Sequence, residues 1–194
     1  MTQYELNILY NLRKQAYDLN VRENLFKYLV VDLEIREMSH PKPLKAKMLP
    51  HRFTGTKFKC EIIHLKLLIQ RGIEIFCIYR PPKCSYDETK KLMKYISSIL
   101  NPNVLIYGDF NIPKINWDSM YTNNELGQLL IDFCSQNEIH QHIKENTRDA
   151  SILDLVFTKP KNLIENYNIS APFSTSDHNM ISFILTLNSI ENEK

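Results

Sequence analysis

Glycine is scarce in this chain of 194 residues, and its scarcity excludes whole classes of binding site. The four glycines are Gly55, Gly72, Gly108 and Gly127, and no two of them lie close together. Loops that cradle a nucleotide phosphate need clustered glycines, because a backbone without Cβ atoms approaches the phosphate closely. The sequence therefore argues against a P-loop and against a dinucleotide-binding loop.

Cysteine clusters and long apolar runs are missing as well. The cysteines, Cys60, Cys77, Cys84 and Cys134, show no C-x-x-C spacing, so no zinc site is predicted. No apolar run has the length that a membrane-spanning helix requires. The first residues, MTQYELN, are polar and acidic where a secretory leader is basic and then apolar. We therefore expect an intracellular protein with free thiols, no membrane association and no evident protein partner.

Charge of one sign is not abundant enough to identify a partner. The net charge is only +2, and 43% hydrophobic with 24% charged residues is ordinary for one globular domain. One local run, KPLKAKMLPHRFTGTKFK (42–59), holds six Lys or Arg residues and no acid. Such a run is typical of a solvated loop or of a nucleic-acid contact, and the sequence leaves both open.

The apolar pattern predicts strands alternating with helices. CEIIHLKLLI and IEIFCIY, separated by QRG, predict an antiparallel hairpin over residues 60–79. Ser85 and Glu88 have the spacing of a capping box, and Asn123 or Asn124 can cap a second helix. VLIY, SILDLVF and NMISFILTL predict three more strands. These elements favour an α/β protein with a mixed sheet.

Two polar pairs follow or interrupt the predicted strands. VLIYGDFNIP ends a strand with Asp109 and Asn111, which alternation places on the same side of the chain. Asp-x-Asn after a strand is also a common turn. Asp154 lies within the apolar run SILDLVF, and a buried carboxylate needs a partner. That partner is either a structural Lys or Arg or, as we expect, His178 in STSDHN.

These residues combine into a site of one chemical kind. A buried aspartate that binds one imidazole nitrogen holds the tautomer and raises the basicity of the ring. Asp109, Asn111 and Asp177 would surround the pair formed by Asp154 and His178. Carboxylates and an amide without thiolate ligands suit a hard cation such as Mg²⁺. The combination predicts phosphoester hydrolysis, in which a carboxylate activates water.

The motifs resemble those of the endonuclease/exonuclease/phosphatase superfamily. In particular, they are similar to the apurinic-endonuclease-like domain of non-LTR retrotransposons. The matching segments are YRPP (79–82), GDFN (108–111), TR (147–148), LDLVFT (153–158) and SDH (176–178). The resemblance implies a four-layer α/β sandwich of two packed mixed sheets flanked by helices, incomplete at its amino-terminal side. It divides the chain into a poorly matching segment with the basic connector (1–56), the domain (57–188) and a tail (189–194).

The resemblance also implies a role for each catalytic residue. Tyr79 would approach the scissile phosphate, and Asp109 would orient or deprotonate the attacking water. Asn111 would contact a phosphate oxygen and steady Asp109. Asp154 would orient His178, which would stabilise the pentavalent phosphate.

Metal, substrate and location follow from the same resemblance. Asp177 and Asp109 would hold Mg²⁺ or Mn²⁺, and Arg80 and Arg148 would bind the substrate. The substrate implied is DNA, nicked by a Mg²⁺-dependent endonuclease, and the implied location is the nucleus.

The amino-terminal part departs from the family pattern. The family places an asparagine motif and then a metal-binding glutamate before the hairpin. Here Asn7 or Asn11 and Glu34 or Glu37 are the available counterparts, and their flanking residues do not match. Three functions stay open. The chain is a Mg²⁺-dependent DNA endonuclease, a sibling phosphodiesterase that acts on RNA, lipid or inositol phosphate, or a truncated, non-catalytic mobile-element relic with at most weak nucleic-acid binding.

Overall fold

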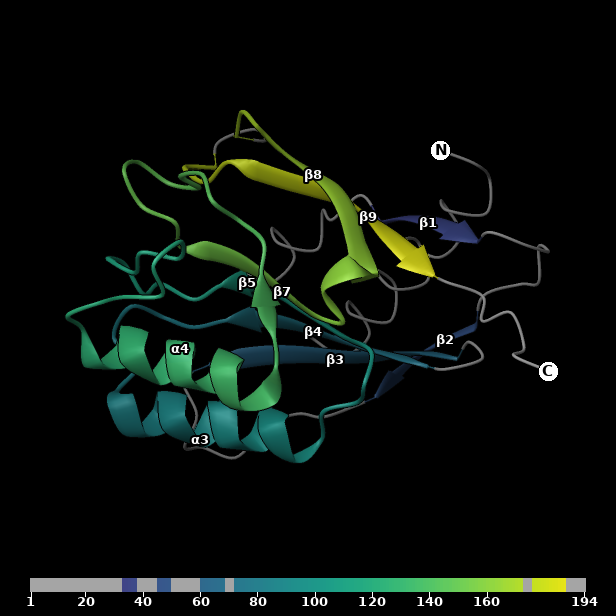
Figure 1. Ribbon diagram of the computed structural model, residues 1–194, viewed down its shortest axis with the longest axis horizontal. Helices are drawn as coiled ribbons and strands as arrows, with labels where there is room; N and C mark the ends of the chain where they lie inside the picture. The colour runs from purple at the N-terminus through teal and green to yellow at the C-terminus, as the bar shows by residue number, and fades with distance from the viewer. Residues whose placement is uncertain (1–32, 38–44, 50–59, 69–71, 173–175, 188–194) are drawn as a thin grey trace.

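The computed structural model describes residues 33–37, 45–49, 60–68, 72–172 and 176–187 (Figure 1). The strands are β1 (Leu33–Glu37), β2 (Lys45–Leu49), β3 (Glu61–Leu68), β4 (Ile73–Tyr79), β5 (Val104–Asp109), β6 (His140–Gln141), β7 (Asp154–Lys159), β8 (Ile164–Ser170) and β9 (Met180–Leu187). The helices are α3 (Tyr86–Ser98), α4 (Glu125–Asn137) and the short 3-10 helix η1 (Lys161–Leu163). None of these described helices is long and apolar enough to cross a membrane.

The described strands form two sheets, and both are mixed. The larger has six strands in the order β2-β3-β4-β5-β7-β6, and the smaller has three in the order β1-β9-β8. In the larger sheet all neighbours are antiparallel except β4 and β5. Parallel neighbours need a crossover connection, which α3 provides between these two strands. In the smaller sheet β9 runs parallel to β1 and antiparallel to β8.

Local sequence signals explain where both helices begin. The capping box predicted at Ser85 is present, since its Oγ accepts from the N–H of Glu88 and the Glu88 carboxylate accepts from the Ser85 N–H. Leu92 and Ile96 of α3 are buried, as their spacing predicts. Of the two predicted caps of α4, Asn124 is the one that the structure uses. Both helices therefore form where local chemistry directs them.

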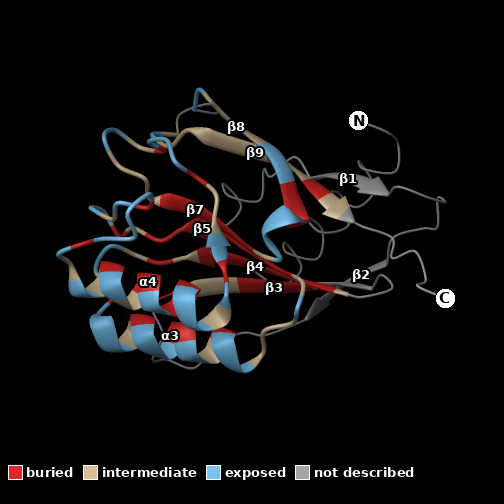
Figure 2. Ribbon diagram, viewed as in Figure 1, coloured by how far each residue is buried: buried red, intermediate tan, exposed pale blue. Residues whose placement is uncertain are grey.

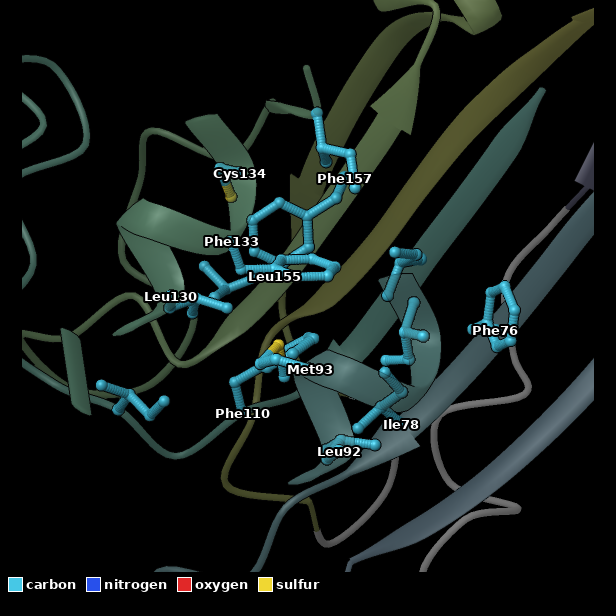
Figure 3. Close-up of a cluster of buried hydrophobic side chains, with 14 of the residues drawn as sticks. Phe76, Ile78, Leu92, Met93, Phe110, Leu130, Phe133, Cys134, Leu155 and Phe157 are labelled. Carbon is cyan, nitrogen blue, oxygen red and sulfur yellow. The ribbon is translucent and has the colours of Figure 1, made fainter. Parts of the chain in front are cut away.

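Two apolar cores lie on the two faces of the larger sheet. On the helix side, Phe110 and Phe157 meet edge to face with ring centroids 5.3 Å apart (Figure 3). On the other face, Tyr107 packs against Phe183 of β9, between the two sheets. Strands β4, β5 and β7 are therefore buried along almost their whole length (Figure 2). Because both faces of the larger sheet are packed against apolar cores, the ends of these strands are held in place.

The α/β class with two packed mixed sheets is confirmed. The helices α3 and α4 lie together on one face of the larger sheet, and the smaller sheet lies on the other (Figure 1). In the ranges that the structure describes, no helix covers the outer face of the smaller sheet. Three of the four expected layers are therefore seen there.

Two strands correct the sequence analysis. The predicted hairpin of residues 60–79 is confirmed by the antiparallel pairing of β3 with β4. The basic connector is not irregular throughout, because β2 lies within it and pairs with β3. Strand β8, IENYNIS, was not expected, since its side chains are mostly polar and only its first residue is fully buried. Its pairing with β9 makes this segment a strand, although its own residue pattern does not predict one.

Candidate active site

Three chemically active side chains lie side by side at one end of the larger sheet. Tyr79 of β4 pairs with Asp109 of β5, and Asp109 pairs in turn with Asp154 of β7. Directly paired residues on neighbouring strands point to the same face, with Cβ atoms about 5 Å apart. This face is the one that packs against the smaller sheet. Strand register thus places a phenol and two carboxylates in a row.

The turn after β5 holds Asn111 against Asp109. Gly108 has φ +137° and Asn111 has φ +48°, so the backbone does not continue as the regular strand that alternation assumed. The Asn111 backbone N–H donates to Asp109 Oδ1 at 2.9 Å, and its Nδ2 donates to Oδ2 at 2.6 Å. The same Nδ2 donates to the Arg80 carbonyl at 3.0 Å. The expected proximity of the pair is present, and a left-handed turn produces it.

The expected contact between Asp154 and His178 is present. His178 Nδ1 lies 2.7 Å from Asp154 Oδ2, and both side chains are at most 10% exposed. Asp154 is the first residue of β7 rather than an interior one, so its carboxylate stands at the same sheet end as Asp109. In the described part of the chain, Asp154 Oδ1 is buried and has no hydrogen-bond partner.

Thr147 joins the two segments that carry this pair, a role that the sequence analysis did not assign. Its fully buried Oγ1 accepts from the backbone N–H groups of Leu153 and Asp154, both at 3.0 Å. Its carbonyl accepts from the Asn179 N–H at 2.8 Å. The threonine therefore holds the start of β7 beside the residue that follows His178. Its only sequence signal was its place in the TR motif.

Burial and neighbouring charges shift the pKa values of three of these groups. Burial, reinforced by the negative charge of Asp154, raises the pKa of Asp109 to about 6. The hydrogen bond that His178 donates to Asp154 raises the pKa of His178 above its usual 6.5, although partial burial opposes the shift. Burial, with Asp109 and Glu61 nearby, raises the pKa of Tyr79. At neutral pH Asp109 is therefore a carboxylate of increased basicity, and Tyr79 is a neutral donor.

Arg148 and Asp177 lie at the exposed side of His178. Arg148 Nη2 lies 2.6 Å from Asp177 Oδ2, and its Nη1 lies 3.3 Å from His178 Nε2. Asp177 Oδ1 is 3.9 Å from the same Nε2. The Asp177 side chain is 67% exposed, and its partner here is Arg148. The two residues are close to the site, as expected, and they form an ion pair with each other.

The substrate-binding role expected for Arg80 is wrong, because its side chain is fully buried. Its Nε donates to Thr89 Oγ1 at 2.9 Å and its Nη2 donates to the Cys84 carbonyl at 2.6 Å. Its Nη1 donates to the carbonyls of Phe110 and Asn111, both at 3.3 Å. The guanidinium thus ties the start of α3 to the Asp109 turn and has no surface to offer a ligand.

Arg80→Lys should lower the free energy of unfolding by about 2–4 kcal/mol, because a single ammonium cannot reach all the acceptors that lie around the edges of the guanidinium. Urea unfolding followed by circular dichroism measures the loss. Arg148→Lys is the matched control, and a change below about 1 kcal/mol is expected for that half-exposed ion pair. Equal losses in the two variants would contradict the structural role of Arg80.

Asp154→Asn should lower the pKa of His178, since the charged partner that raises it is removed. A ¹H–¹⁵N NMR titration of the imidazole measures the shift, with His178→Gln used for assignment. Asp177→Asn serves as the control, and a smaller fall is expected because the Asp177 charge is the weakest of the causes. An unchanged His178 pKa in Asp154→Asn would show that the two side chains do not interact in solution.

Of the expected amino-terminal counterparts, the structure describes only the backbones of Glu34 and Glu37. Asn7 and Asn11 lie outside the described residues. The backbones of Glu34 and Glu37 lie in β1, paired with Ile184 and Leu187 of β9. Ile184 is six residues beyond His178, or about 20 Å along a strand. The side chains of β1 are outside the described part.

Glu61 is an acidic residue at this sheet end that the sequence analysis missed. It pairs with Tyr79 across β3 and β4, so the row of side chains runs from Glu61 through Tyr79 and Asp109 to Asp154. Glu61 is half-buried, and its charge contributes to the raised pKa of Tyr79. The sequence signal for the position of Glu61 was the predicted hairpin. Once the register of the hairpin is known, the first residue of β3 lies opposite the last residue of β4.

Comparison with known proteins agrees with this geometry. The family model described as endonuclease-reverse transcriptase matches residues 73–182, which is more than half of the chain. The chain belongs to this family. The matched range of this endonuclease-reverse transcriptase family member includes all of β4, β5 and β7 and the segment that holds His178. No curated protein matches the chain.

Among solved structures, the fold is similar to one described as the endonuclease domain of TRAS1, a telomere-specific non-LTR retrotransposon. The TM-score is 0.59 at 18% sequence identity, and the match covers 72% of this chain. The chain spans 66% of the length of that domain. At this identity the likeness establishes the fold alone. It agrees with the resemblance to the endonuclease/exonuclease/phosphatase superfamily found in the motifs.

Proposed function

We propose that the protein is a Mg²⁺-dependent phosphodiesterase that nicks DNA. The observation that carries the proposal is the register of β5 and β7, which places Asp109, held by Asn111, beside Asp154, held by His178. This arrangement combines a basic carboxylate with an imidazole supported by a second carboxylate. Both are required where water attacks a phosphodiester and negative charge accumulates on the phosphate.

Asp109 is the proposed general base. Its pKa of about 6 lets it remain ionised at pH 7 while it accepts a proton more readily than an ordinary aspartate does. Both carboxylate oxygens accept hydrogen bonds from Asn111, which keeps the group in one orientation. A water molecule hydrogen-bonded to Asp109 would thereby be directed at the phosphorus atom and lose its proton to the carboxylate.

His178 and Tyr79 are the proposed donors to the phosphate. Asp154 favours the imidazolium form of His178, as the raised pKa shows, so the ring can donate from Nε2 to a phosphate oxygen. Tyr79 stays protonated and can donate from its hydroxyl. Both donors would be strongest toward the pentavalent phosphate, because it carries more negative charge than the substrate does.

Arg148 is the proposed phosphate-binding residue at the entrance. In the described structure it contacts Asp177 and His178 Nε2. An entering phosphate would compete for the guanidinium, since bidentate pairing with phosphate is favourable. Movement of the Arg148 guanidinium toward the phosphate would free Nε2 of His178 to donate. It would also free the carboxylate of Asp177.

The oxygen-rich donor set fits Mg²⁺ only with help from the substrate. Among the described residues, no three His, Cys, Asp or Glu side chains are grouped to hold a metal ion. Mg²⁺ needs just one or two carboxylates when phosphate oxygens and water complete its shell. Asp109 would hold it, with Asp177 at the entrance, and the buried Asp154 Oδ1 lacks a hydrogen-bond partner in the described structure. When bound there, Mg²⁺ would polarise the phosphate as a Lewis acid.

The absence of a three-ligand group among the described residues keeps a second candidate function open. The backbones of Glu34 and Glu37 pair with Ile184 and Leu187 of β9, and no three His, Cys, Asp or Glu side chains of the described residues are grouped to hold a metal ion. A chain in this condition would bind nucleic acid weakly without cleaving it. The two functions differ in a single measurement.

Conversion of supercoiled plasmid to the open-circular form decides between them. The purified chain is incubated with plasmid in Mg²⁺, in Mn²⁺ and in excess EDTA, and the products are separated on agarose. Nicking that follows protein concentration and disappears in EDTA is expected. Absence of nicking at every protein and metal concentration, with gel-shift binding retained, would overturn the enzymatic proposal in favour of the second function.

A further inference from the structure

Two buried thiols face each other close to the Asp109 turn. Cys60 directly precedes β3, and Cys84 directly precedes Ser85, the cap of α3. Their Sγ atoms are 3.1 Å apart, and the residues are 5% and 3% exposed. A disulfide bond is about 2.05 Å long, so the two sulfurs need to approach by only about 1 Å.

The thiol pair contacts the residues that support the site. The Cys84 carbonyl accepts from Arg80 Nη2 at 2.6 Å, and the same guanidinium donates to the carbonyls of Phe110 and Asn111. On the other side, Cys60 adjoins Glu61, the residue paired with Tyr79. A bond between the two sulfurs would therefore tie β3 to the Arg80 loop beside the row of site residues.

We propose that Cys60 and Cys84 are an oxidative modification site, at which hydrogen peroxide converts the two thiols into an intramolecular disulfide. One sulfur, as thiolate, attacks a peroxide oxygen; the O–O bond breaks, leaving a sulfenic acid and hydroxide. The second sulfur attacks the sulfenic sulfur, the S–S bond forms and the S–O bond breaks. In total, two thiols lose two electrons and two protons, and one peroxide becomes two waters. A dithiol reductant reverses the modification.

The surroundings make this oxidation slow and pH-dependent. Burial raises the pKa of Cys60, with Cys84 and Glu88 adding to the shift and the Arg80 cation opposing it. The reactive thiolate is therefore a minor species at neutral pH. As long as the pH is below the pKa, the thiolate fraction rises about tenfold for each unit by which the pH is increased. Hydrogen peroxide is favoured as the oxidant because it is a small molecule and both sulfurs are almost inaccessible.

Peptide mapping of the oxidised protein tests the proposal directly. The full chain is treated with hydrogen peroxide at pH 7 and pH 9, unreacted thiols are alkylated in denaturant, and the digest is analysed by mass spectrometry without reductant. A linked peptide pair containing Cys60 and Cys84 is expected, lighter than the two thiol peptides by two hydrogens and formed faster at pH 9. Dithiothreitol should abolish it.

Cysteine substitutions distinguish a link between Cys60 and Cys84 from a link that involves Cys77 or Cys134. Cys77 packs between the sheets and Cys134 lies on α4, so Cys77→Ala/Cys134→Ala should still form the linked peptide at the wild-type rate. Cys84→Ala should not form it. No linked peptide in the wild type, or a link that joins Cys77 or Cys134 instead, would overturn the proposal. The wild-type map needs no variant, and neither result depends on whether the protein nicks DNA.

Discussion

Asp109→Asn is expected to lower the rate of plasmid nicking by about 10³-fold. The substitution keeps the size of the side chain and removes the carboxylate whose two oxygens both accept hydrogen bonds from Asn111. An amide cannot accept the proton of the attacking water, so the base is lost, while the single amide oxygen can still accept one of the two hydrogen bonds from Asn111. The measurement is the initial rate of open-circle formation at saturating Mg²⁺.

The control for this prediction is Asp132→Asn on the exposed face of α4. Asp132 accepts a hydrogen bond from Gln128 within the same helix and is remote in sequence from the row of site residues. We expect its nicking rate to match the wild type within a factor of two or so. If Asp109→Asn kept its rate within tenfold of the wild type while folding normally, Asp109 would not be the base.

The pH dependence of the nicking rate provides a second test of Asp109 as the general base. Because a protonated carboxyl cannot act as a base and the pKa of Asp109 is about 6, the wild-type rate should fall as the pH drops below about 6. A cation beside the carboxylate favours its ionised form, so higher Mg²⁺ should move this midpoint to lower pH. An acid limb that does not respond to Mg²⁺ would assign the titration to another group.

Gly108→Ala is expected to destabilise the protein by more than about 4 kcal/mol, enough to prevent folding of a domain of ordinary stability. Gly108 has φ +137°, a conformation that side chains rarely adopt, and an added Cβ would lie 1.9 Å from the carbonyl oxygen of Ile78. That carbonyl belongs to the neighbouring strand β4, which is buried between two layers and cannot move aside. The measurement is soluble yield, followed by urea unfolding of whatever folds.

Gly127→Ala is the matched control for this prediction. An added Cβ there would approach the Thr122 side chain at 2.9 Å and Ile115 Cγ1 at 3.0 Å, which are side-chain atoms rather than backbone. The residue lies in α4, where alanine is favoured over glycine by about 1 kcal/mol, and this gain offsets part of the crowding. A smaller loss than in Gly108→Ala is expected. Equal unfolding midpoints for the two variants would show that the close approach of β4 and β5 at Gly108 is not rigid.

The sequence predicted most residues of the candidate site because several of them carry strong local signals. Asp109 follows an apolar strand, Asp154 interrupts one, and His178 precedes one. The pairing of β5 with β7 then places Asp109 opposite Asp154, two residues that are 45 positions apart in the chain. Long-range register of this kind is not written in any short segment, since it depends on the packing of both faces of the sheet. The assignment of Asp154 to His178 was correct because a buried carboxylate must find a partner.

The residues whose roles were wrong or missed are those whose environment is tertiary. Arg80 stands in a motif that suggested substrate contact, yet two of the carbonyls that accept from its guanidinium come from a turn about 30 residues later. Glu61 looked like an ordinary strand residue until its register with Tyr79 was known. Cys60 and Cys84 are 24 positions apart, and nothing in the sequence between them indicated that their sulfurs meet.

The sequence by itself determined the class of the fold, the starts of both α-helices and the central hairpin, and it predicted most residues of the candidate site. Each of these depends on periodicity, capping or the cost of burying a charge, all of which act over a few residues. Only the tertiary structure decided which carboxylates share a row, which arginine is buried and which thiols touch. These depend on strand order and register, and register is set by how two cores pack against one sheet.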